Sequence, residues 1–118
     1  MDFSSLEIEA SRYEQQLRKH RRALHRIPEL GYEEIKTHEY LMRHLEKLAP
    51  DDLRVFAQTG IRAVFRGDGT GRVIAFRSDI DALPIQEATG CTFASEHSGR
   101  MHACGHDGHM ANLLTFAQ

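Results

Sequence analysis

The segment from His102 to His109 reads His-Ala-Cys-Gly-His-Asp-Gly-His and is rich in side chains that bind metal ions or carry protons. Cys104 and His106 are two residues apart, and thiolate and imidazole are both preferred ligands of zinc and its transition-metal neighbours. Gly105 lies between them and permits a bend, because glycine adopts positive φ at little cost. The pattern therefore predicts a metal site, with three further candidate ligands: Asp107, His102 and His109. The alternative is a loop with surface histidines and a core cysteine.

A second polar segment, residues 78–84, contains the carboxylates Asp79 and Asp81. It directly follows Arg72 to Arg77, whose apolar centre is typical of a strand covered on both faces. Open α/β sheets place their ligands beyond the carboxyl ends of the strands. We therefore expect both aspartates near the metal site, the alternative being an Asp-rich turn closed by Pro84.

The spacing of apolar residues predicts the elements that position these two segments. A long amphipathic helix runs from Ser4, which with Glu7 resembles a capping box, to about Ile27, where Pro28 ends it. A final helix carries Asp107 as its N-cap. Between them we expect a helix with Glu33 and Glu34 in its first turn and ending before Pro50, strands at 53–57, 61–66 and 72–77, a hairpin loop at 67–71 and an irregular stretch at 86–100. This order predicts an α/β sandwich.

Composition limits the classes of function. At 118 residues the chain suits one domain, and its hydrophobic content of 41% and charged content of 27% are ordinary for a soluble protein. A formal net charge of −2 gives no basis for binding nucleic acid or an anionic membrane. The start of the chain lacks the apolar region of a secretory signal, and no apolar run suffices for a membrane span. We therefore predict a cytoplasmic protein with both thiols reduced, although a disulfide between Cys91 and Cys104 would abolish the metal site.

Three motifs resemble the metal-dependent amidohydrolases and aminoacylases that include hippurate hydrolase and auxin-conjugate hydrolase. They cover residues 24–34 (LHRIPELGYEE), 77–85 (RSDIDALPI) and 99–109 (GRMHACGHDGH). Their order and spacing match along nearly the whole chain, and the third motif is highly specific. The resemblance implies a mixed-sheet, helix-flanked, metallopeptidase-like catalytic domain that hydrolyses the amide bond of N-acyl amino acids or related conjugates.

The resemblance also implies roles for individual residues. Cys104 and His106 correspond to ligands of a site for two divalent ions, zinc, manganese or cobalt. In the wider superfamily a histidine ligand stands at the position of Asp79, and the aspartate that orients it at that of Asp81. Because this sequence has aspartate at both places, we expect Asp79 and Asp81, with Asp107, to support the site rather than bind metal.

Family members are considerably longer than this chain, so residues 1–118 are expected to be the amino-terminal part of the catalytic domain, without the smaller second domain. The general-base glutamate and the other ligands would then follow residue 118, although Glu87 or Glu96 could approach the site in space. We expect this chain alone to be inactive, and the complete enzyme could be a homo-oligomer. The alternative is a non-catalytic metal-binding or interaction module with the same fold.

Overall fold

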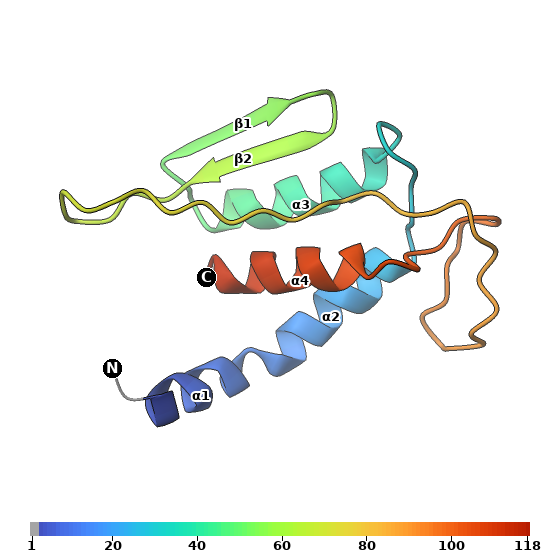
Figure 1. The fold of residues 1–118 in the computed structure, drawn as a ribbon, viewed down its shortest axis with the longest axis horizontal. Coiled ribbons are helices and arrows are strands. Elements are labelled where there is room, and N and C mark those ends of the chain that lie inside the picture. The colour runs from blue at the N-terminus through green and yellow to red at the C-terminus, as the bar shows by residue number, and fades with distance from the viewer. Residues whose placement is uncertain (1–2) are drawn as a thin grey trace.

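Three helices, α2, α3 and α4, pack side by side around a small apolar core (Figure 1). The structure is a computed structural model that describes residues 3–118. Its elements in chain order are α1 (Phe3–Arg12), α2 (Glu14–His25), α3 (Ile35–Lys47), β1 (Asp52–Phe56), β2 (Gly60–Val64) and α4 (His106–Phe116). The predicted α/β class is confirmed, with the helices forming one layer and the two-stranded sheet lying against α3.

The core forms where the apolar faces of the three helices meet. Leu24 of α2, Leu41 of α3, and Met110 and Leu114 of α4 are all at most 8% exposed. Four partly buried side chains extend this cluster toward the hairpin and the 79–81 segment: Tyr40, Leu45, Ile61 and Ile80. The core therefore holds α4 against α2 and α3, and the start of α4 carries the predicted metal motif.

The predicted helix from Ser4 to Ile27 is two helices. The chain leaves helical hydrogen bonding at Tyr13, and α2 ends at His25, shortly before Pro28. No residue of α1 is buried, and Leu6 is 46% exposed, because α1 makes few contacts, chiefly with α2. Ser4 is inside α1 rather than capping it, and residues 1 and 2 lie outside the described part of the chain. The apolar stripe therefore gave the right helical period but overstated the buried length.

Helix α3 begins at Ile35, so the prediction that Glu33 and Glu34 occupy its first turn is wrong, and its start is stabilised from outside the helix. The buried carboxylate of Glu29 accepts hydrogen bonds from the backbone N–H of Lys36 at 3.0 Å and of Thr37 at 2.8 Å. The Thr37 hydroxyl donates to the same carboxylate at 2.8 Å. These bonds satisfy backbone donors that the first turn of a helix leaves unpaired. A glutamate in the turn before α3 thus performs the capping role.

The hairpin joins the first two predicted strands, so the hairpin predicted across residues 67–71 is wrong. Strands β1 and β2 are antiparallel, with Asp52 opposite Val64 and Phe56 opposite Gly60. The turn contains Ala57 and Gln58, both with positive φ (47° and 70°). Neither residue type signals such a turn, whereas the glycines at 67–71 do.

The third predicted strand, residues 72–77, is an irregular extended segment and is not buried. Val73 is 97%, Ile74 74% and Phe76 59% exposed. No described strand pairs with this segment, so its apolar side chains lack the cover that was inferred from their sequence. An apolar run indicates a buried strand only where neighbouring strands and helices are present.

Helix α4 starts two residues earlier than predicted, because Gly105 rather than Asp107 occupies the N-cap position. Gly105 has φ +94°, a conformation that side chains disfavour, so the bend expected there is confirmed. Asp107 lies in the first turn, where its charge favourably opposes the helix dipole. Within residues 3–118, no helix has the length and apolar character needed to span a membrane.

We predict that Ile74→Asp lowers the binding of a hydrophobic dye and lowers self-association while changing the thermal midpoint little. The side chain is largely exposed, so the substitution removes apolar surface without opening a cavity. Dye fluorescence, light scattering and a thermal melt measure these effects, with Arg72→Asp in the same exposed segment as the control. Dye binding equal to that of the original chain would show that the apolar surface lies elsewhere.

A second prediction concerns His20, which is 3% exposed and whose Nδ1 lies 2.8 Å from the Tyr40 hydroxyl. Burial, with the charges of His44 and Lys19, lowers the pKa of His20 to about 4. Since an unfolded histidine has a pKa near 6.5, the unfolded chain takes up this proton first. The free energy of unfolding should therefore fall as the pH decreases from about 6.5 to about 4.

The measurement is urea unfolding across this range, in which one such histidine contributes a slope of up to about 1.4 kcal/mol per pH unit. His20→Gln should reduce the slope, and His109→Gln at an exposed position should not. An identical slope in His20→Gln would contradict the assignment.

Candidate metal centre

His106, the first residue of α4, is held in one orientation by the segment that contains Asp81. Its Nδ1 lies 2.9 Å from the Asp81 carbonyl oxygen and 3.0 Å from Asp81 Oδ1. Both oxygens are acceptors, so Nδ1 carries the hydrogen and Nε2 presents its lone pair. Asp79 Oδ2 is 3.8 Å from Nε2, too far for a hydrogen bond. A histidine that donates Nδ1–H to a carboxylate and leaves Nε2 free is the usual arrangement of a metal ligand.

Cys104 lies just before α4 and has a free, exposed thiol. It lines a pocket of about 380 Å³ that also includes His25, Glu87, Cys91 and His102. Cys91 is likewise free, in agreement with the expectation of reduced thiols. The thiol of the predicted motif is therefore accessible to an ion.

Asp79 and Asp81 lie beside the motif, as the resemblance implies. Asp81 is 41% exposed and contacts His106 directly, whereas Asp79 is 46% exposed and pairs with Arg77 at 2.8 Å. The two aspartates follow an irregular segment rather than the strand that the sequence predicts, so their location near His106 depends on other contacts. One of these is the bond from the Ala82 N–H to the Glu29 carbonyl oxygen, at 2.7 Å.

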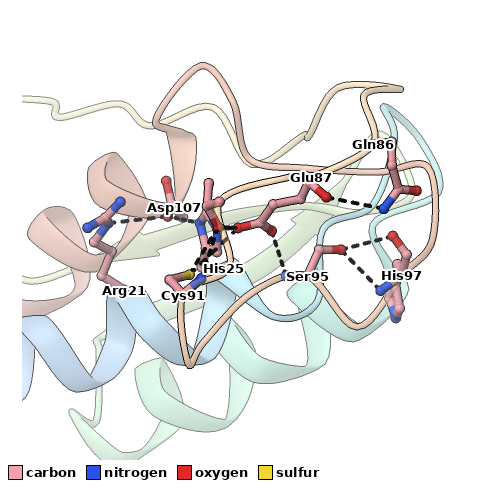
Figure 2. Close-up of polar contacts among 9 residues, drawn as sticks. Arg21, His25, Gln86, Glu87, Cys91, Ser95, His97 and Asp107 are labelled. Atoms are coloured by element: carbon pink, nitrogen blue, oxygen red, sulfur yellow. Dashed lines mark hydrogen bonds and ion pairs between the residues drawn. The ribbon is translucent and has the colours of Figure 1, made fainter.

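Asp107 is fully buried and joins α4 to the end of α2 (Figure 2). Its Oδ2 lies 2.7 Å from His25 Nδ1 and 3.3 Å from Arg21 Nε. On the other side of the ring, His25 Nε2 lies 3.1 Å from Glu87 Oε1. A carboxylate thus faces each nitrogen of a ring that is only 4% exposed. This network joins the first turn of α4 to the last turn of α2.

Glu87 approaches the motif from the irregular segment, whereas Glu96 does not. Burial raises the pKa of Glu87, but hydrogen bonds from Thr89, the Ser95 amide and His25 bring it down to about 2. Its carboxylate is therefore ionised and fully engaged by donors (Figure 2). Glu96 is 62% exposed, with its carboxylate 3.6 Å from the Arg26 guanidinium.

His102 provides a test of whether these residues suit a metal ion. It is 4% exposed, yet neither ring nitrogen has a hydrogen-bond partner among the described residues, and neither does Asp107 Oδ1. Burial, with the charges of His25 and His106, lowers the pKa of His102 to about 4 although Asp107 and Asp81 oppose this shift. A neutral imidazole with unpaired nitrogens, an accessible thiol and the free His106 Nε2 form a donor set that fits zinc and its neighbours. His109 is exposed, and its ring centroid is 5.7 Å from that of His106.

Sequence reasoning missed His25, to which it assigned no role in the site. His38 and His44, two other histidines outside the motif, bond to the backbone oxygens of Thr59 and Tyr40. His25 instead belongs to the buried network beside the motif. The presence of His25 in the first of the three motifs could have indicated a role near the site, whereas its position in the helical pattern could not.

Comparison with known proteins identifies relatives for most of the chain. Residues 75–118 match peptidase family M20/M25/M40. The N-acetyldiaminopimelate deacetylase of Leuconostoc citreum is 51% identical over 102 residues, which are 83% of this chain and 26% of the relative. The N-acetyldiaminopimelate deacetylase of Bacillus subtilis is 50% identical over 95 residues, covering 80% of this chain and 25% of the relative. The chain therefore spans about a quarter of the length of these curated relatives.

Two solved structures have the same fold. A candidate aminohydrolase from methicillin-resistant Staphylococcus aureus superposes with a TM-score of 0.87 at 37% identity, over 99% of this chain and 31% of that one. The Bacillus subtilis YXEP protein, described as a dinuclear metal-binding peptidase of the M20 family, has a TM-score of 0.81 at 42% identity. That match covers 88% of this chain and 30% of that one. Both likenesses confirm the fold class and the resemblance inferred from the three motifs.

We predict that Asp107→Asn lowers the free energy of unfolding by about 3–5 kcal/mol, because it leaves His25 and Arg21 without their shared buried carboxylate. Chemical denaturation measures this change. Glu9→Gln is the control, since the Glu9–Arg12 pair is on the exposed surface of α1 and should alter stability by no more than about 0.5 kcal/mol. Equal effects of the two substitutions would argue against a supporting role for Asp107.

Proposed function

Because this chain belongs to peptidase family M20/M25/M40, we propose that it provides the amino-terminal part of the catalytic domain of a metal-dependent amidohydrolase. The reaction is hydrolysis of the amide bond of an N-acyl amino acid, and the N-acetyldiaminopimelate deacetylases make N-acetylated diamino acids the first substrates to test. The observation that carries this proposal is the orientation of His106, whose Nδ1 is bound by Asp81 and whose Nε2 is free at the start of α4.

In this proposal Cys104 and His106 hold a divalent transition metal, one of a pair in the complete enzyme, as in the dinuclear M20 relative. Asp81 fixes the tautomer of His106, and Asp79 adds negative charge near Nε2. Asp107 holds the start of α4 through His25. A metal bound there would supply Lewis-acid polarisation of the amide carbonyl and lower the pKa of a bound water.

In this proposal, the remaining metal ligands and the general base belong to polypeptide outside residues 1–118. Two observations support this division. The chain spans about a quarter of the length of its curated relatives, and the apolar segment 72–77 has no strand partner among the described residues. The cytoplasmic location and a homo-oligomeric state of the complete enzyme remain predictions.

One observation favours a non-catalytic metal-binding module as the function of this chain by itself. Glu87 is the carboxylate that lines the pocket beside Cys104, and both of its oxygens already accept hydrogen bonds. A general base needs a free oxygen within reach of the attacking water. Among the described residues that line this pocket, no other carboxylate is available for proton transfer.

The test uses the 118-residue chain with Cys91→Ser, so that Cys104 is the only thiol. We predict that cobalt binds weakly, that Cys104→Ser and His106→Ala each reduce the affinity severely, and that Asp81→Asn reduces it about 10–100-fold by releasing His106. Competition against a metal indicator measures these affinities. Asp68→Asn, in the loop at 67–71, is the control and should bind like the parent chain.

Hydrolysis is measured as the release of amino acid from N-acetyldiaminopimelate and hippurate with added manganese, zinc or cobalt. We expect no robust turnover by the chain alone and restored turnover when the remaining length found in its relatives is supplied in the same polypeptide. Metal binding that is indifferent to both Cys104 and His106 would refute the assignment of this centre.

A further inference from the structure

A second group of metal-binding side chains lies on the wall of the same pocket, outside the Cys104–His106 motif. One donor atom each from His25, Glu87 and Cys91 lies within 4.8 Å of the other two. Their residues come from the end of α2 and from two positions of the irregular segment (Figure 2). We propose that His25, Glu87 and Cys91 form a separate binding site for a divalent transition metal of the zinc type.

The separations between the donor atoms are close to those that zinc requires. Bonds of about 2.0–2.3 Å in a tetrahedral site place the donor atoms about 3.2–3.8 Å apart. His25 Nε2 is 3.1 Å from Glu87 Oε1, and Cys91 Sγ is 3.7 Å from the same oxygen. Only the gap between the sulfur and the imidazole nitrogen, at most 4.8 Å, has to shorten, and Cys91 lies on an irregular loop. Three donor atoms are thus close to the separations of a zinc site, on the wall of a pocket that His102 and Cys104 also line.

Neighbouring groups fix two of the ligands as they do in established metal sites. Asp107 Oδ2 lies 2.7 Å from His25 Nδ1 and orients the ring so that Nε2 faces the Glu87 carboxylate, where an ion would take the place of the hydrogen bond between them. The Ser95 N–H donates to Glu87 Oε2 at 2.6 Å and holds the other oxygen toward His25. These neighbours are buried or partly buried, so they hold His25 and Glu87 in place before any ion arrives.

The combination of donors selects the class of ion. A thiolate, an imidazole and one carboxylate suit zinc and cobalt, whereas calcium and magnesium require mostly oxygen ligands. The charges around the site also favour a cation. The carboxylates of Asp107 and Glu87 face the two nitrogens of the His25 ring. A dication that binds there displaces the thiol proton of Cys91, and any proton on His25 Nε2, to solvent.

Cobalt titration of the 118-residue chain tests the site, because thiolate–cobalt bonds give a charge-transfer absorption in the near ultraviolet. Cys104→Ser removes the thiol of the motif and should retain about one equivalent of thiolate-bound cobalt. Adding Cys91→Ser should abolish that absorption. In the Cys104→Ser background, Glu87→Gln should weaken binding at least tenfold, whereas His97→Gln on the same irregular segment should not, since His97 bonds to the Pro28 carbonyl oxygen instead.

The variants distinguish this site from the motif. If Cys104→Ser alone abolishes thiolate-bound cobalt, both cysteines serve one centre and the proposal is overturned. If Cys91→Ser in that background leaves the absorption unchanged, the proposal is also overturned. Circular dichroism identifies any variant that fails to fold, and Cys91→Ala, at a partly exposed loop position, then replaces it. Failure of the function proposed above would appear separately: in the Cys91→Ser chain, Cys104→Ser and His106→Ala would then leave the cobalt affinity unchanged.

Discussion

The hydrogen bond between Asp107 and His25 is the constraint on which the metal-binding region depends. A fully buried carboxylate is costly to desolvate unless it is paired, and Asp107 finds its partners only on α2. The first turn of α4 must therefore lie against the last turn of α2. His106 begins the same helix as Asp107, and Cys104 lies two residues before His106. The pairing of Asp107 with α2 therefore also determines where these two residues lie relative to the pocket. The apolar core stabilises the helix pair, whereas the buried carboxylate specifies how the helix ends align.

Glu29 has a corresponding role for the second polar segment. Its carboxylate caps α3, and its carbonyl oxygen accepts from the Ala82 N–H, so the turn after α2 connects α3 to the residues beside His106. Asp81 reaches His106 because this backbone bond holds its neighbour. The first of the three motifs, which contains both His25 and Glu29, thus contributes no ligand to the predicted centre, yet it positions the segment with the proposed ligands and the segment that supports them.

The sequence allowed prediction of what depends on local periodicity and spacing. The helices at 35–47 and 106–116, the class of the fold and the proximity of Cys104 to His106 all follow from patterns within a few residues. The segment 72–77 was wrongly predicted because burial of an apolar strand depends on partners that its own sequence does not encode. The hairpin turn was misplaced because Ala57 and Gln58 adopt positive φ without glycine. His25 was undervalued because its partners, Asp107 and Glu87, lie 82 and 62 residues away in sequence.

Hydrogen bonds between aspartates and histidines also explain how the two proposed metal sites can lie around one pocket. Each contains a histidine whose Nδ1 faces an aspartate, His106 with Asp81 and His25 with Asp107, and whose Nε2 points toward the proposed ion position. They differ in exposure, since Asp81 is 41% exposed and Asp107 is fully buried. Electrostatic interactions are weaker near water, so the His106 pair is the more easily reoriented of the two. The proposed Cys104–His106 centre therefore needs further ligands to hold an ion firmly. In the proposed site of His25, Glu87 and Cys91, the first two side chains are already held by their neighbours, and only Cys91 has to move closer.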